Sequence, residues 1–236
     1  MAKITFGTGS SILMNIGHEK KFSENGIVTA LAWVLQGEPT YAFEGITNFT
    51  GAVVAWLKDQ LNLIPSAEAS EALAVSVPDN GGVIFVPSFV GFSAPYWRSD
   101  VQGAIFGLTP GVTKEHIARA ALEGIGFTVT DVLRVMGKDA GIPLLQLNAD
   151  GGAARNRFLM QFVADLNQRE LWASNLVDLS ALGAVFSGGL AVGTYRGLDE
   201  LRQIETGFSK YAPQMPKDKV DEIYAGWLDA VKKILS

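Results

Sequence analysis

Apolar positions in the opening part of the chain come in short runs separated by turn residues. These runs cover 4–6, 12–16, 28–33 and 40–43. Short runs of this kind, bounded by turn residues, are typical of β-strands. Gly7-Thr8-Gly9 separates the first two runs and Gln36-Gly37-Glu38 the last two, so the pattern predicts two hairpins, the first with a glycine-rich corner. We expect an antiparallel meander here.

From Phe49 onward the spacing of apolar residues becomes helical, at intervals of three and four. The rest of the chain then mixes both patterns. Helices are predicted at about 49–61, 68–75, 113–141, 154–166, 179–190 and 217–235, and short strands at 83–86, 103–108, 144–148 and 170–173. Thr113 is the expected N-cap of the longest helix, which should stop at Gly141-Ile142-Pro143.

Strands and helices alternate in the second half, which argues for a sheet with helices packed on it. The chain contains no internal repeat, low-complexity tract or Ser/Gly-rich linker. We therefore expect one α/β domain over residues 1–236.

Composition narrows the functional classes. The formal net charge is -5 and the basic residues form no stripe, so nucleic acid is not an expected partner. The absence of cysteine excludes disulfides, a thiolate nucleophile and cysteine-ligated zinc. The N-terminus has no apolar signal segment, and no apolar run reaches the length of a membrane span. We expect a cytoplasmic protein without a membrane partner.

Two glycine-rich corners are candidate phosphate sites. Asp150-Gly151-Gly152 lies between a predicted strand and a predicted helix, with Asn156 expected in the first helical turn. Glycine removes the Cβ that would hold a ligand away, and a helix start presents unpaired amides. Gly7-Thr8-Gly9 could wrap its amides around an anion in the same way. Either corner, taken alone, could be an ordinary tight turn. Gly51, at a helix start, could simply permit close packing.

Other polar residues carry weaker signals. His18 and His116 have no second ligand at metal-binding spacing, so no metal site is predicted. Glu123 and Asp131 share the long helix, but their separation leaves no close pair for acid–base chemistry, which favours solvent-facing or structural roles. The aromatic residues between positions 89 and 97 could line a pocket or cap the core, and the core is favoured.

Taken together, these segments resemble the C-terminal domain of the FGGY carbohydrate kinases, and most of all its glycerol kinase members. The resemblance runs from Lys3 almost to the last residue. It rests on several motifs in family order, namely Gly7-Thr8-Gly9, Ser23-Glu24-Asn25-Gly26, Tyr41-Ala42-Phe43-Glu44-Gly45, Ala94-Pro95-Tyr96-Trp97, the stretch from Gly103 to Glu123, and Asp150-Gly151-Gly152 with Asn156.

The resemblance implies an actin-like, ribonuclease-H-like α/β fold with a mixed five-stranded sheet flanked by helices. It implies ATP and Mg²⁺ as cofactors and a small polyol or sugar as substrate. The nucleotide-binding residues implied are Thr8, Gly9, Gly51, Gly151, Gly152 and Asn156.

Two positions depart from the glycerol kinase pattern. Where those enzymes place a Phe on the substrate, this chain has Ser11, which leaves room or a hydroxyl for a larger or more polar substrate. Where they have a Gln that reaches the nucleotide, this chain has Ala55. The departures put glycerol itself in question.

The resemblance also implies a missing half. The family's catalytic Asp and first phosphate loop belong to an N-terminal domain that this sequence lacks, so no catalytic residue is expected in the chain, which alone should be inactive. Two hypotheses follow: half of a working ATP-dependent kinase, or a non-catalytic nucleotide-binding or interaction module derived from the same fold. An N-terminal neighbour with a phosphate loop and a catalytic Asp would favour the kinase. Without it, exposed apolar surface could promote homo-oligomers.

Overall fold

The structure is a computed structural model that describes residues 1–176, 178–204 and 207–236. A mixed sheet of seven strands forms its centre, in the order β3-β4-β2-β1-β7-β8-β9. Its strands are β1 (Ala2–Phe6), β2 (Ser10–Gly17), β3 (Val28–Leu35), β4 (Glu38–Thr47), β7 (Gln146–Asp150), β8 (Glu170–Ser174) and β9 (Phe208–Tyr211). β1, β7 and β8 run parallel, and the other pairings are antiparallel.

The expected count of five strands is wrong, because β3 and β9 extend the two edges of the sheet. The meander is also wrong in one respect, since β4 rather than β3 pairs with β2. Burial explains this order. Phe43 of β4 is fully buried, and a Cβ on Gly45 would meet Val132 of the long helix at 2.3 Å, so β4 packs tightly as an inner strand. β3 has no buried residue and takes the edge.

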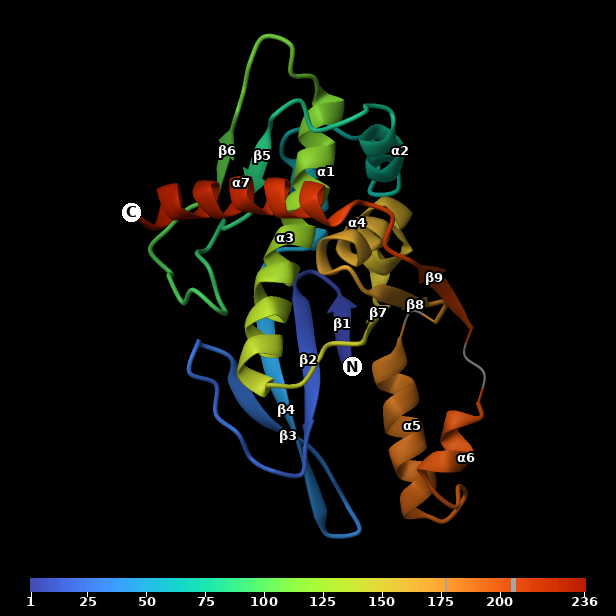
Figure 1. The fold of residues 1–236 in the computed structure, drawn as a ribbon. Coiled ribbons are helices and arrows are strands. Elements are labelled where there is room, and N and C mark those ends of the chain that lie inside the picture. Colours follow the sequence, from blue (N-terminus) through green and yellow to red (C-terminus); the bar gives the residue numbers. More distant parts are fainter. Residues whose placement is uncertain (177, 205–206) are drawn as a thin grey trace.

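The helices are α1 (Gly51–Asp59), α2 (Ala69–Val75), α3 (Lys114–Ala140), α4 (Arg157–Asn167), α5 (Leu179–Ala191), α6 (Leu198–Arg202) and α7 (Lys217–Leu235), with a short 3₁₀ turn, η1 (Gly152–Arg155), before α4. They lie over one face of this sheet or, in the case of α5 and α6, to one side of it (Figure 1). Two short strands, β5 (Ile84–Val86) and β6 (Ala104–Phe106), pair antiparallel in a separate two-stranded sheet. Among the described residues, no helix is both long and apolar enough to cross a membrane.

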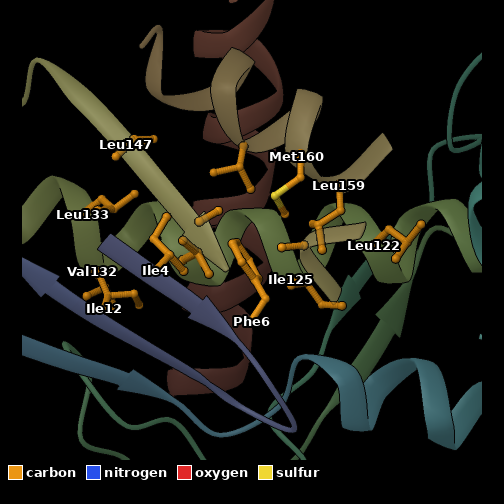
Figure 2. Packing of buried hydrophobic residues seen from close by; sticks show 14 of the residues in the cluster. Ile4, Phe6, Ile12, Leu122, Ile125, Val132, Leu133, Leu147, Leu159 and Met160 are labelled. Carbon is orange, nitrogen blue, oxygen red and sulfur yellow. The ribbon is translucent and has the colours of Figure 1, made fainter. Parts of the chain in front are cut away.

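The main core lies between the sheet and α3 and α4. Figure 2 shows Ile4, Ile12 and Leu147 from the strands packed against Ile125 and Leu133 of α3, all nearly or fully buried. Because successive side chains of a strand point to opposite faces of the sheet, the remaining side chains of these strands lie on the face opposite α3. Lys3, Ser11 and Asn148 are only half-buried there, and Leu13 is exposed.

The ends of α3 agree with the sequence. Thr113 is its N-cap, and the backbone amide of Thr113 donates to Nδ1 of His116 at 3.1 Å. Gly141 follows the helix in the left-handed region, with φ of 62°, where glycine ends helices without a steric penalty. His116 therefore has a structural role at a helix start. His18, in a turn, contacts the carbonyl of Pro39 through Nδ1 at 2.7 Å.

Candidate functional site

A cavity of about 690 Å³ opens between the β1–β2 turn, the start of α1, the region of α2, and the corner between β7 and α4. Its volume lies within the ~300–1,000 Å³ range of small-molecule sites. The lining combines apolar side chains with a few polar groups. It comprises Phe6, Gly7, Thr8, Gly51, Ala52, Val54, Ala55, Ala67, Glu68, Ser70, Glu71, Leu122, Gly152, Ala153, Arg155, Asn156 and Leu159.

Four of the residues expected at the site meet in this cavity, although up to 148 positions separate them in sequence: Thr8, Gly51, Gly152 and Asn156. Gly9 and Gly151 lie beside it without lining it. Ser11 lies on the uncovered face of the sheet, where its hydroxyl is 3.5 Å from Oε1 of Glu44. The cavity therefore gathers four of the six predicted nucleotide residues and leaves the predicted substrate residue outside.

The β1–β2 turn is fixed by the start of α1. The amide of Gly51 donates to the carbonyl of Gly7 at 2.9 Å, and the amides of Thr50 and Ala52 donate to the carbonyl of Thr8 at 2.9 and 3.1 Å. A Cβ on Gly51 would lie 2.8 Å from the oxygen of Gly7, so only glycine allows this approach. The amides at the start of α1 are thus hydrogen-bonded to the turn.

This anchoring orients the amides of the turn. In a trans peptide the N–H points opposite to the C=O of the same unit. Because the carbonyls of Gly7 and Thr8 point at α1, the N–H groups of Thr8 and Gly9 point away from it. Within the described part of the chain, neither amide nor the hydroxyl of Thr8 donates to a protein acceptor. Two neighbouring free amides and a hydroxyl suit an anion.

The corner between β7 and α4 contains two glycines, and the fold requires glycine at only one of them. Gly151 has φ of 92°, and a Cβ there would lie 2.4 Å from the carbonyl oxygen of Phe6. The fold itself therefore requires glycine at position 151. A Cβ on Gly152 would meet nothing within 4 Å and would project into open space. Gly152 lines the cavity, so the space beside it is available to a ligand.

Asn156 lies at the start of α4 as its N-cap, not inside the first turn as expected. Its backbone is extended, at φ of -75° and ψ of 106°, because η1 takes the preceding residues. The Oδ1 atom accepts from the amide of Leu159 at 2.9 Å, and Nδ2 donates to the hydroxyl of Ser70 at 3.2 Å. Asn156 thus joins α4 to α2 and sets the width of the cavity between them.

Three charged residues lie on the cavity wall. Glu71 is held by Arg157, whose Nε is 2.8 Å from Oε1, whereas Glu68 is exposed. Hydrogen bonds from its own backbone amide and from Ser66 lower the pKa of Glu68. Arg155 is exposed and has no ion-pair partner within 4.0 Å among the described residues. It supplies the positive charge on this wall.

Sequence reasoning missed several of these lining residues. Ser70 and Glu71 come from α2, which has no local motif, and only the tertiary contact with α4 brings them to the cavity. Arg155 lies between Gly152 and Asn156, so its place within a candidate motif was a usable signal.

The described residues provide few ligands for Mg²⁺. Within residues 1–176, 178–204 and 207–236, no group of three or more His, Asp or Glu side chains is placed to hold a metal ion. Asp150, near the turn, is buried and pairs with Lys3 at 2.9 Å. The described residues therefore provide no group of three ligands for Mg²⁺, an ion that proteins commonly hold through one or two carboxylates together with nucleotide phosphates.

Comparison with known proteins agrees with this fold. The model of the FGGY family of carbohydrate kinases, C-terminal domain, matches residues 2–192. A glycerol kinase of Stenotrophomonas maltophilia is 47% identical over 236 residues, covering 100% of this chain and 47% of that protein. A glycerol kinase of Francisella tularensis subsp. novicida is 44% identical, covering 99% of this chain and 47% of that protein.

Solved structures show the same relationship. The crystal structure of Plasmodium falciparum glycerol kinase with ADP has a TM-score of 0.91 at 32% identity, and covers 100% of this chain and 47% of that one. Ligand-bound xylulose kinase from Lactobacillus acidophilus shares the fold, with a TM-score of 0.86 at 22% identity over 100% of this chain and 47% of that one. The chain spans about half the length of the relatives that it matches. It belongs to the FGGY family of carbohydrate kinases, and its residues 2–192 correspond to the C-terminal domain of that family.

Proposed function

We propose that this chain is the nucleotide-binding half of an ATP-dependent kinase that phosphorylates a hydroxyl of a small polyol or sugar. The observation that carries the proposal is the meeting of Thr8, Gly51, Gly152 and Asn156 around one cavity of suitable size. The relative of known structure with a TM-score of 0.91 was solved with ADP.

The β1–β2 turn and the corner between β7 and α4 would bind different parts of the nucleotide. The free amides of Thr8 and Gly9, with the hydroxyl of Thr8, would hold the terminal phosphates. The space beside Gly152, walled by Asn156 and α2, would take the adenosine. Arg155 would add an attractive charge for an anionic ligand. Gly51 would act indirectly, by fixing the turn.

Phosphoryl transfer depends on positioning and on electrostatic stabilisation around the transferred group. This chain would supply half of that positioning. The group that takes the proton from the attacking hydroxyl would come from an N-terminal domain, and Mg²⁺ would enter with the nucleotide. We expect no phosphorylation of glycerol by this chain alone. Such a kinase would work in the cytoplasm, where ATP is plentiful.

A different surface would contact the substrate that accepts the phosphoryl group. Ser11 and Glu44 lie together on the uncovered face of the sheet, where the hydroxyl of Ser11 could donate or accept a hydrogen bond and the carboxylate of Glu44 could accept one from a hydroxyl group. A polar pair at this place suits a polyhydroxylated substrate of the polyol or sugar class.

Calorimetric titration with ADP tests nucleotide binding. The chain should bind ADP, and Gly152→Val should weaken binding at least about tenfold, because the added side chain fills the space beside the cavity wall. Gly137→Val, also in open space but in α3 outside the cavity, is the matched control and should bind as the parent does. The proposal fails if the parent takes up no ADP, or if both variants bind it unchanged.

A further inference from the structure

Helix α2 forms part of the cavity wall although it is only 7 residues long. Ser70 and Glu71 of α2 line the cavity, as do Ala67 and Glu68 just before the helix. An isolated helix of this length is not stable in water. Contacts with the neighbouring helices α3 and α4 must therefore fix the position of α2 (Figure 1).

The first turn of α2 is held by α4. The Nδ2 atom of Asn156 donates to the hydroxyl of Ser70 at 3.2 Å, and Nε of Arg157 donates to Oε1 of Glu71 at 2.8 Å. The backbone amide of Arg157 also donates to Oε2 of Glu71 at 2.7 Å. These bonds reach only the N-terminal part of α2, so other contacts fix its C-terminal end.

Arg119 of α3 provides hydrogen bonds at the C-terminal end of α2. Its Nη1 atom donates to the carbonyl of Ala74 at 3.3 Å and to the carbonyl of Val77, just beyond the helix, at 2.7 Å. The last carbonyls of a helix lack partners within it and carry partial negative charge, so a cation is favourable there. The Cζ atom of Arg119 also lies 5.1 Å from the centroid of the Phe158 ring in α4. One side chain thus contacts α2, the segment that follows it, and α4.

A buried carboxylate orients Arg119. Its Nε atom donates to Oε1 of Glu123, one turn later in α3, at 2.9 Å, and Nδ2 of Asn80 donates to Oε2 of Glu123 at 2.7 Å. The side chain of Glu123 is 8% exposed and that of Arg119 is 19% exposed. A guanidinium presents its donors in a rigid planar fork, so the bond from Nε to Glu123 also sets the direction of Nη1 towards α2. Leu122, between the two charged residues, lines the cavity, whereas Arg119 and Glu123 do not.

We propose that Arg119 is a positioning residue for the nucleotide, which holds α2 at the distance from α4 that adenosine requires. This inference rests on the proposed function for the identity of the ligand. Without the guanidinium, the C-terminal end of α2 would lose its hydrogen bonds to α3, and the wall formed by Ser70 and Glu71 would shift with it. The β1–β2 turn would keep its shape, because hydrogen bonds from α1 fix it. Loss of Arg119 should therefore weaken binding of the adenosine part of ADP and leave binding of its phosphates unchanged.

Calorimetric titration of the chain with ADP and with inorganic pyrophosphate tests this division. Arg119→Met removes the guanidinium, and Arg119→Lys keeps the charge without the planar fork. The affinity for ADP should fall at least about tenfold in Arg119→Met and at least about threefold in Arg119→Lys, with the affinity for pyrophosphate unchanged in both. Arg169→Lys is the matched control and should bind both ligands as the parent does. Arg169 is an exposed arginine that donates to the carbonyls of Leu144 and Gln168 and does not line the cavity.

Hydrogen exchange gives a second measurement without a ligand. Amides of α2 should exchange at least about threefold faster in Arg119→Lys than in the parent, whereas those of α4 should be unchanged. Arg119→Met leaves the buried carboxylate of Glu123 without its cation, so Arg119→Lys decides the test if the Met variant does not fold.

Three results would overturn the inference. Equal losses of affinity for ADP and pyrophosphate would show that Arg119 acts on the fold as a whole. Unchanged exchange of α2 in Arg119→Lys would show that other contacts fix the helix. ADP binding that is normal in the parent and in the folded Arg119 variants would refute the positioning role and leave the proposed function intact. A parent chain that binds no ADP would instead refute the proposed function, and the positioning role with it.

Discussion

At the scale of single residues, the clearest structural device is a buried carboxylate. Asp131 of α3 accepts hydrogen bonds from the hydroxyl of Tyr224 at 2.5 Å, the indole of Trp227 at 2.9 Å and the hydroxyl of Tyr96 at 2.9 Å. It thereby joins α3 to α7 and to the aromatic loop. The sequence had favoured core packing for that loop, and Tyr96 performs this role through Asp131.

This carboxylate should make stability depend on pH. Burial raises the pKa of Asp131 to about 6, against the opposing effect of its three donors. The folded state therefore binds a proton that the unfolded state has released between about pH 4 and pH 6. The stability contributed by Asp131 is present below pH 4 and is lost as the pH rises through 6.

Urea unfolding at several pH values checks this. Between pH 4 and pH 7, the free energy of unfolding of the parent should fall, relative to that of Asp131→Asn, by about 2 kcal/mol, because the amide does not titrate. Asp229→Asn, at an exposed position of α7, is the control and should run parallel to the parent. Parallel curves for Asp131→Asn would refute the raised pKa.

The candidate site was predictable where the chemistry is local. Both glycine corners stand out in the sequence, and the structure places them around one cavity. What each glycine does was not predictable. Gly151 is needed by the fold, Gly152 leaves open space, and Gly51 keeps its amide for the turn. These differences depend on φ and on distant carbonyl groups, which a single sequence does not reveal.

At the scale of elements, capping distinguishes a packed helix from an unpacked one. The side chain of Asn156 caps α4 at Leu159, and that of Asp178 caps α5 at Ala181, each at 2.9 Å. α4 contributes Met160 and Val163 to the core, whereas α5 buries nothing. The same chemistry thus supports two helices of very different importance to global stability.

Removing each cap should therefore have unequal effects. Asn156→Ala should cost roughly 1–2 kcal/mol in the free energy of unfolding, since it removes the cap and the hydrogen bond to Ser70. Asp178→Ala should change it by less than about 0.5 kcal/mol, because fraying of α5 exposes no core. Urea unfolding followed by tryptophan fluorescence measures both. Equal losses would contradict the view of α5 as unpacked.

Element prediction followed periodicity. α3 and α7 were predicted almost residue by residue, because long amphipathic stripes with clear ends determine them. β9 and α6 were missed, since each is short and has no buried residue to impose a pattern. The order of strands was mistaken because pairing between β2 and β4 depends on packing against α3, which no local pattern encodes.

At the scale of the whole molecule, the chain is organised around one covered and one uncovered face of its sheet. The core, the α3–α4 layer and the cavity lie on the covered side of the sheet. Other parts of the described chain do not cover the exposed side of α5 or the sheet face that carries Ser11. We infer that nucleotide binding is retained by this half and that catalysis needs both, with closure of the second half strengthening the hold on ATP.

A crystal structure from crystals of the chain soaked with saturating ADP tests the proposed nucleotide site most directly. We expect adenosine in the space beside Gly152 and Asn156, with the phosphates within hydrogen-bond distance of the amides of Thr8 and Gly9. ADP bound at another place, or phosphates that leave both amides free, would contradict it.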